Sequence, residues 1–275
     1  MKQLCIIIYI LLLFQDSYSQ FAFQSTYRGN NTNSGWSVQQ TKDGGYIMMG
    51  ESFSFGAGST DLFLTKTDRM GNILWSRNFG GKDSDYGRHI IQTKDGGYII
   101  LGYTFSFGAG EADVYLIKTD ANGDTLWTRT FGGTNVDHGY SVVQAPDGGY
   151  VIAGETSSFG AGNGDLYLIK TDINGDTLWT KTYGGTNSDI GNSVQQTSDG
   201  GYIVVGYTSS FGANADVYLI KTDSSGNTYG CNYPNTLTQV VSTVTMVVSS
   251  GGIIGSGSSI GNTSTILNST STIVN

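Results

Sequence analysis

The apolar residues of this chain occur in short runs, which are separated by turns rich in glycine, asparagine and aspartate. Tyr150 to Ala153 and Leu166 to Ile169 are two such runs, and Asn174-Gly175 follows the second. Asn-Gly and Asp-Gly between apolar runs are typical of tight β-hairpins. The runs do not follow the 3.6-residue period of an amphipathic helix. The pattern therefore predicts an all-β protein.

The pattern also predicts a unit of four antiparallel strands joined by loops. In the third unit these strands are 141–144, 149–154, 165–171 and 176–183. The two middle strands are apolar at successive positions, so both of their faces must be covered. Without helices only neighbouring sheets can cover them, and four-stranded sheets packed face to face around an axis form a β-propeller. A solenoid is the competing architecture, but its repeat is usually shorter and its strands are parallel.

This unit recurs four times along the chain. Asp-Gly-Gly-Tyr recurs with a spacing of 52 residues, and Ser-Phe-Gly-Ala and Lys-Thr-Asp recur in step with it. A period of this length indicates a repeat architecture. The first motif starts at Asp43, Asp95, Asp147 and Asp199, and the repeats are expected to cover about 35–86, 87–138, 139–190 and 191–229.

The two ends of the repeat region are complementary. Residues 23–35 align with 179–191, which places Phe23 in the position of Trp179, whereas the fourth repeat lacks its own outer strand. The simplest inference is that an N-terminal strand at 21–28 completes the fourth blade, because this pairing removes the exposed sheet edges. We therefore predict one propeller of four-stranded antiparallel blades, closed by the N-terminal strand. Two alternatives stay open: two chains that form a larger ring, and a chain that is part of a longer propeller.

The segments outside the repeats differ in character. Residues 1–19 combine a charged start, an apolar run and small residues, which predicts a signal peptide and a secreted or cell-surface protein. The propeller is then expected at 20–229, and 230–275 is a Ser/Thr/Val-rich tail. After removal of 1–19, Cys231 is the one remaining cysteine, so no internal disulfide is expected. The formal net charge of −8, without a basic stripe, argues against nucleic acids and anionic membranes as partners.

A set of spaced residues recurs in the repeats, as in Asp113 to Asp120, Gly123, Trp127, Phe131-Gly132-Gly133, Asp137-x-Gly139 and Asp147 to Tyr150. With these residues the chain resembles, over about 21–229, the SBBP-type β-propeller repeats of secreted bacterial proteins. The spacing Asp120…Gly123-x-x-x-Trp127 is also similar to the tryptophan-docking unit of quinoprotein propellers, with a turn one residue shorter. These resemblances imply the fold and export, and they imply that Trp75, Trp127, Trp179 and, in the same position, Phe23 pack between adjacent blades. They imply little about activity, because propellers support many functions.

The longer loops are the first candidate for a functional surface. In a propeller, the loops between repeats and the loops between the two middle strands share one face, and here they carry a ring of carboxylates and amides. Such a ring would suit glycan hydroxyls or cations, whereas the alternative is that each side chain caps its own turn. The candidates are Asp85, Asn135, Asp137, Asn187, Asp189, Asp113 and Asp165.

Two glutamates suggest an enzymatic alternative. At the end of the second strand the four repeats read Glu51, Tyr103, Glu155 and Tyr207. In a four-bladed ring the two glutamates would face each other across the axis, and glycoside hydrolysis uses two facing carboxylates. Against this, glutamate is ordinary in exposed loops, and nothing nearby marks one residue as the acid and the other as the base.

Metal sites are not expected in the repeats. Two turns are similar to the start of a calcium loop, but the distal bidentate glutamate is absent, and a tight hairpin already explains Asn-Gly. His89 and His138 occupy non-equivalent positions and are expected to be surface or partly packed residues. We expect no cofactor, with calcium at the two turns as the alternative. The calcium candidates are Asp120, Asn122, Asp124, Asp172, Asn174 and Asp176.

The sequence thus favours an exported, non-catalytic binding or structural module whose partner is a protein or a polysaccharide. The alternative is a carbohydrate-active enzyme that uses Glu51 and Glu155. A purely architectural repeat in a larger surface assembly is the third interpretation. Because the four units are so similar, no single position stands out as an active site.

Overall fold

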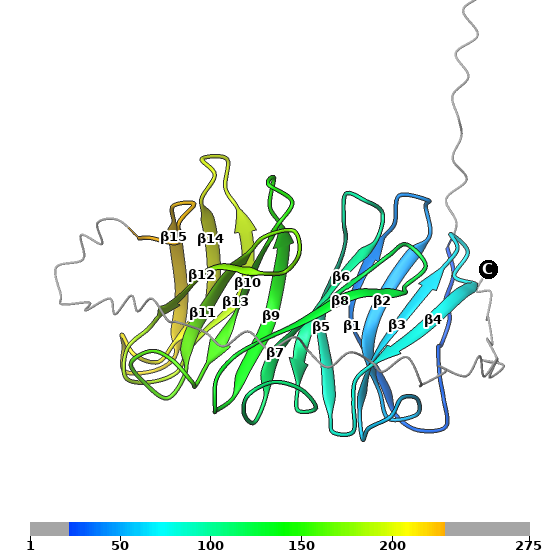
Figure 1. Ribbon diagram of the computed structural model, residues 1–275, viewed down its shortest axis with the longest axis horizontal. Coiled ribbons are helices and arrows are strands. Elements are labelled where there is room, and N and C mark those ends of the chain that lie inside the picture. Colours follow the sequence, from blue (N-terminus) through cyan, green and yellow to red (C-terminus); the bar gives the residue numbers. More distant parts are fainter. Residues whose placement is uncertain (1–21, 229–275) are drawn as a thin grey trace, which may run out of the picture.

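The computed structural model describes residues 22–228, which form 15 β-strands in four antiparallel sheets (Figure 1). The expected signal peptide at 1–19, the tail at 230–275 and Cys231 lie outside the described residues. Within 22–228 there is no helix with the length and apolarity to cross a membrane.

The strands follow the sequence order in each sheet, so that every sheet is a simple meander. Sheet 1 consists of β1 (Asn33–Gln40), β2 (Tyr46–Ser52), β3 (Asp61–Thr67) and β4 (Ile73–Phe79). Sheet 2 consists of β5 (Asp85–Gln92), β6 (Tyr98–Thr104), β7 (Asp113–Thr119) and β8 (Thr125–Phe131). Sheet 3 consists of β9 (Asp137–Gln144), β10 (Tyr150–Thr156), β11 (Asp165–Thr171) and β12 (Thr177–Tyr183). Sheet 4 has β13 (Asp189–Gln196), β14 (Tyr202–Thr208) and β15 (Asp216–Thr222).

The recurring sequence motifs have structural roles at the hairpin turns. In sheet 3 the Asp147 carboxylate of Asp-Gly-Gly-Tyr accepts a hydrogen bond from the Gly149 amide over 3.0 Å. The nearly buried Lys170 ammonium of Lys-Thr-Asp lies 2.8 Å from the same carboxylate and also donates to the Thr171 carbonyl. Equivalent ion pairs join Lys66 to Asp43 and Lys118 to Asp95. The two motifs therefore recur together because each lysine ties the turn before β2, β6 or β10 to the end of the next strand.

The core lies between successive sheets. Leu62 and Leu64 of β3 are fully buried against Ile90 and Ile100 of sheet 2. The same type of cluster joins sheet 2 to sheet 3 and sheet 3 to sheet 4. Burial of a leucine side chain stabilises a fold by about 1.5–3 kcal/mol, so these layers supply most of the stability. Each inner sheet is covered on both faces by its neighbours in sequence.

The predicted closure into a four-bladed propeller is wrong. The four sheets lie in an open row, with sheet 1 and sheet 4 at opposite ends (Figure 1), and β15 pairs with β14 alone. Residues 23–28 lie against sheet 1 instead of completing sheet 4. The Phe23 ring is 5.7 Å from that of Tyr46, and the Tyr27 hydroxyl donates to the Gly71 carbonyl over 2.7 Å.

The correction has a physical reason. The alignment of Tyr27 with Tyr183 matches their contacts, because the Tyr183 hydroxyl donates to the Gly226 carbonyl of sheet 4 as Tyr27 does to Gly71 of sheet 1. Residues 23–28 thus dock on the sheet that follows them, as β12 docks on sheet 4. The repeat pattern of the sequence indicates that residues 23–28 dock on a sheet, but it does not indicate the angle between successive sheets. That angle decides whether four sheets complete a circle, and here they do not.

Candidate binding site

Every sheet carries a β-bulge near the middle of its first strand. The unpaired residues at these bulges are Trp36, Arg88, Tyr140 and Asn192. A bulge places one extra residue on one strand and redirects its side chain, and bulges are frequent beside functional sites. The bulges therefore mark four equivalent places where the repeat can present a different side chain.

The residues at and around these bulges differ between repeats whose other strand positions are nearly the same. Two residues before the bulge the repeats have Ser34, Tyr86, His138 and Ile190. Paired with these four residues, at the end of the second strand, are Glu51, Tyr103, Glu155 and Tyr207. Because the backbone is the same in each sheet, this variety is not required for folding. We call the bulge residues and these two sets of neighbours the bulge row.

Arg88 connects sheets 1 and 2 in the bulge row. It donates to the Tyr103 hydroxyl over 2.8 Å, and its guanidinium lies 3.9 Å from the Glu51 carboxylate. The guanidinium also lies over the Trp36 ring, 4.7 Å from its centroid. Tyr86 stacks on Tyr103 with 5.0 Å between ring centroids. A cation enclosed by aromatic faces is held in a defined place, because each ring face attracts positive charge.

Glu155 is the centre of the next group, in sheet 3. His138 Nδ1 donates to the Glu155 carboxylate over 2.9 Å, and the Tyr140 hydroxyl donates to the same oxygen over 2.8 Å. Burial by itself raises the pKa of Glu155, but the two hydrogen bonds outweigh burial and hold the pKa below its ordinary value. The Tyr103 ring packs on the His138 ring with 3.9 Å between centroids. Sheets 1, 2 and 3 therefore share one continuous cluster.

The cluster has unused hydrogen-bonding capacity and accessible aromatic surface. Glu51 Oε2 and His138 Nε2 are buried atoms without a hydrogen-bond partner among residues 22–228. Buried polar atoms are nearly always hydrogen-bonded, so such a pair needs an explanation, for example a ligand or water. Trp36 is 53% exposed, and Phe105, which packs edge-on against Tyr103, is also exposed. The bulge row thus offers aromatic faces beside polar atoms that still need partners.

The carboxylates predicted for the binding face are buried between the sheets. The Asp137 carboxylate accepts hydrogen bonds from the Ser158 hydroxyl over 2.6 Å and from the Gly133 amide over 2.8 Å. The Asp113 carboxylate accepts one from the Ala109 amide over 2.9 Å. Asp85, Asp165 and Asp189 make equivalent contacts. Their oxygens organise the loops, as in the turn-capping alternative.

The exposed members of that predicted face are the asparagines. Asn135 and Asn187 lie at the loop surface, and each side-chain amide donates to a serine carbonyl of the neighbouring loop, over 3.1 Å and 3.0 Å. Ligand binding by this face stays a prediction.

Packing raises the pKa values of the buried carboxylates. Burial raises the pKa of Asp113 to about 6, and the neighbouring charge of Asp137 acts in the same direction. Burial likewise raises the pKa of Asp61 to about 6, with Asp85 as the neighbouring charge. Gly132 lies between Asp113 and Asp137, and a Cβ atom there would come within 2.0 Å of Asp113 Oδ1. These pairs belong to the junctions between sheets.

The two glutamates of the enzymatic alternative are not placed across an axis, because the sheets do not form a four-bladed ring. Glu51 is beside Arg88, and Glu155 is held by His138 and Tyr140. A general acid requires a raised pKa, whereas the pKa of Glu155 is lowered. The use of both residues in hydrolysis is therefore without geometric support, and it remains untested.

The two turns that were the alternative for calcium use their carboxylates internally. Asp120 Oδ1 accepts hydrogen bonds from the Asn122 and Asp124 amides, and Asp172 makes the same contacts with Asn174 and Asp176. Asp124 and Asp176 pair with Arg77 and Arg129 of the preceding sheets over 3.2 Å and 3.0 Å. Over residues 22–228, no three His, Cys, Asp or Glu side chains gather in a group that would hold a metal ion.

The tryptophans of the fourth strands contact the following sheet. The Trp75, Trp127 and Trp179 rings lie 6.0, 6.0 and 6.1 Å from the rings of Tyr98, Tyr150 and Tyr202. Each also covers a glycine of the next sheet at positive φ, for example Gly175 under Trp127. Phe23 takes the same place over Gly71 of sheet 1.

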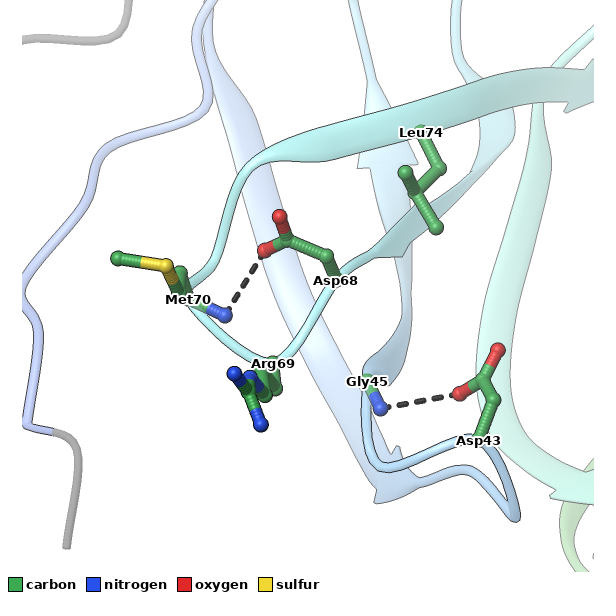
Figure 2. Close-up of a pocket in the computed structure, with 6 residues that line it drawn as sticks. All are labelled: Asp43, Gly45, Asp68, Arg69, Met70 and Leu74. Atoms are coloured by element: carbon green, nitrogen blue, oxygen red, sulfur yellow. Dashed lines mark hydrogen bonds between the residues drawn. The ribbon is translucent and has the colours of Figure 1, made fainter. Parts of the chain in front are cut away.

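A shallow pocket lies between two turns of sheet 1, with a volume of about 420 Å³ (Figure 2). Its Asp68 carboxylate accepts a hydrogen bond from the Met70 amide, and its Asp43 carboxylate accepts one from the Gly45 amide. The Thr41 hydroxyl, aided by Lys66, lowers the pKa of Asp43 to about 2. Both carboxylates thus stabilise their own turns, and the pocket offers little further chemistry.

Sequence reasoning missed most of the bulge row. It considered Glu51 and Glu155 but passed over Trp36, Arg88 and Tyr140, and it treated His138 as a surface or partly packed residue. One signal was available: these are positions at which otherwise similar repeats differ. In a repeat protein, shared residues maintain the fold, and differing residues are free to form a site.

Comparisons with known proteins add little about function. The chain is 29% identical over 174 residues to the regulatory protein FlaEY of Caulobacter vibrioides, which covers 54% of this chain and 18% of FlaEY. It therefore spans under a fifth of the length of that relative. The crystal structure of a protein of unknown function from Bacteroides caccae matches with a TM-score of 0.43 and 12% identity, over 79% of this chain and 61% of that one. No protein-family description matches the chain.

Proposed function

We propose that this chain is an exported, non-catalytic binding module that holds a polysaccharide along the bulge row. The observation that carries the proposal is the combination of exposed aromatic rings with buried polar atoms that lack partners. A sugar ring has C–H faces that stack on an aromatic face and hydroxyl groups that both donate and accept hydrogen bonds. Trp36 and Phe105 supply the faces, and Glu51 and His138 supply the unused atoms.

The charge of the cluster also favours a neutral ligand. Arg88 lies 3.9 Å from Glu51 Oε2 and Glu155 accepts from two donors, so the charges are already balanced within the protein, although Glu51 Oε2 accepts no hydrogen bond. The formal net charge of −8 adds no attraction for an anionic polymer. Binding hot spots usually consist of aromatic side chains surrounded by polar groups that are already paired within the protein.

The test is the binding of neutral polysaccharides to the wild-type chain and two variants, on a glycan array and then by titration calorimetry. Trp36→Ala and Phe105→Ala remove exposed rings, so the fold should be retained. If each ring is a hot spot worth about 2 kcal/mol, affinity falls about 30-fold. Leu126→Ala, at an exposed leucine of β8 outside the bulge row, is the matched control and should leave affinity unchanged.

Two results would refute the proposal. The first is that no polysaccharide binds, or that the tryptophan and phenylalanine variants bind as well as the control. The second concerns the non-catalytic part: a polysaccharide that is shortened by the wild-type chain but not by the Glu51→Gln, Glu155→Gln double variant would identify an enzyme.

A further inference from the structure

The free face of sheet 4 has the composition of an interface. Val217 and Leu219 of β15 are 81% and 64% exposed. Their equivalents in sheet 3, Leu166 and Leu168, are completely buried by sheet 4. Val205 of β14 is exposed as well, although its equivalent Ala153 is buried. The residues that bury sheet 3 against its neighbour are therefore present on sheet 4, where no sheet formed by residues 22–228 covers them.

The opposite end of the row has the complementary face. Val38 of β1 is 66% exposed, whereas its equivalents Ile90, Val142 and Val194 are buried against the preceding sheet. A cavity of about 110 Å³ lies on this face and is lined by Tyr27, Met48 and Phe63 among others. Sheet 1 therefore presents the face that sheets 2, 3 and 4 each use to pack on the sheet before them.

Hydrogen bonds across the sheets repeat the same relation. The Ile90 amide donates to the Ser37 hydroxyl of sheet 1 over 3.3 Å, and the Val194 amide donates to the Ser141 hydroxyl of sheet 3 over 3.2 Å. Between sheets 2 and 3, His89 Nδ1 is the acceptor for the Val142 amide over 3.0 Å. The next members of the series are Ser193 as acceptor, on sheet 4, and the Val38 amide as donor, on sheet 1.

The strands show the same complementarity. Among residues 22–228, sheet 4 has no fourth strand, so β15 is an edge there, and such an edge favours the addition of another strand. Residues 23–28 have the contacts of a fourth strand with the sheet that follows, through Phe23 and Tyr27, but belong to none of the four sheets. In sheet 3 the fourth strand pairs Leu168 with Lys181. The same register would pair Leu219 with Ser25.

We propose that sheet 4 of one copy of this chain packs on sheet 1 of a second copy, whose residues 23–28 add to β15 as the missing fourth strand. A second copy is the occupant because its sheet 1 has the surface that this type of face already binds three times within the chain. The contact continues the internal packing with residues and hydrogen bonds at equivalent positions. It is head-to-tail, so its repetition gives a ring or a longer row.

The first test is the mass of the full-length chain in solution, by size-exclusion chromatography with light scattering. The wild-type chain should have the mass of two or more copies. Val217→Asp places a charge on the free face and should give a single copy with unchanged circular dichroism, because Val217 packs on little within its own chain. Leu126→Asp, at a 60% exposed leucine of β8 away from both end faces, should keep the wild-type mass.

The second test is a disulfide between copies, in chains whose native cysteines are replaced by serine. One chain carries Ser25→Cys and the other Leu219→Cys, and the mixture should give a disulfide-linked pair of unlike chains under mild oxidation. Thr26→Cys replaces Ser25→Cys as the control, since its side chain would point to the other face of the sheet. Opposite residues in antiparallel strands are within reach of a disulfide, whereas a shift by one residue turns the side chain away.

Several results would overturn the proposal. A wild-type chain with the mass of one copy at all concentrations would do so, because the faces would then be free or covered by another segment of the same chain. An assembly that survives Val217→Asp would show that another surface joins the copies. Equal linkage at positions 25 and 26 would contradict the register. None of these readouts involves a ligand, so they are independent of polysaccharide binding.

Discussion

The repeat provides a matched pair of leucines that tests how this protein is stabilised. Leu168 of β11 is fully buried in the layer between sheets 3 and 4. Leu219 has the same position in β15 but is 64% exposed on the end face. The substitution to alanine removes the same atoms from the same strand position, so the two variants differ in whether a following sheet and a fourth strand cover the side chain.

The expected losses of stability follow from this burial. At position 168 the substitution removes a fully buried side chain and leaves a cavity between two sheets, which costs about 2–5 kcal/mol. At position 219 only about a third of the side chain is covered, so the loss should be about 1 kcal/mol or less. Both are measured in the Val217→Asp background, so that a second copy does not cover Leu219.

The assay is urea unfolding followed by tryptophan fluorescence and circular dichroism. The free energy of unfolding should fall far more for Leu168→Ala than for Leu219→Ala. Equal losses would refute the reasoning, because they would show that position 219 is covered within one chain or that the packing of sheets 3 and 4 contributes little.

The remaining predictions concern a glycine and two buried titratable groups. Gly175→Ala should lower the free energy of unfolding by about 2–4 kcal/mol, because φ is +79° and a Cβ atom would lie 2.7 Å from Trp127. Gly44→Ala, with a similar φ but open space around the Cβ atom, should lower it by only about 1–2 kcal/mol, and equal losses in urea unfolding would contradict the tryptophan contact. The pKa of Asp113 is about 6 in the folded state against 3.8 ordinarily, so stability falls as pH rises from about 4 to about 6. Asp113→Asn should lessen this fall in unfolding measured against pH, and Asp61, whose pKa is also about 6, should maintain the rest. Burial lowers the pKa of His89 in the folded state, so as pH falls the unfolded chain takes up a proton before the folded chain does, and stability is lost below about pH 6.5. His89→Gln should lessen that loss, and an unchanged dependence of stability on pH would show that His89 is accessible to solvent.

The sequence predicted the strands well because their signals are local. Asp147-Gly148 and Asn174-Gly175 mark hairpins whatever the rest of the chain does, and a strand that is apolar on both faces requires a cover on both sides. The expected strand at 149–154 corresponds to β10 at Tyr150–Thr156, and that at 165–171 matches β11. The alignment of Tyr27 with Tyr183 also corresponds to equivalent hydrogen bonds.

Closure and the site could not be predicted in the same way. Closure depends on the angle between successive sheets, which results from the summed packing of many side chains and has no motif. The burial of Asp113 and Asp137 depends on a junction between two repeats, whereas a turn-like sequence suggests only a loop. Arg88, Tyr103 and His138 come together from two sheets, and within the sequence each is only one variable position among many.

The central claim is that four sheets lie in an open row whose two ends are apart within one chain. The most direct measurement is the distance between spin labels at Val38→Cys and Leu219→Cys in single copies of the Val217→Asp variant, with native cysteines replaced by serine. Stacked sheets are spaced by about 10 Å, so the three spacings between sheets 1 and 4 predict a separation of about 30 Å. A separation of about 10 Å within a single chain would mean that sheet 4 packs on sheet 1 of its own chain and would contradict the account.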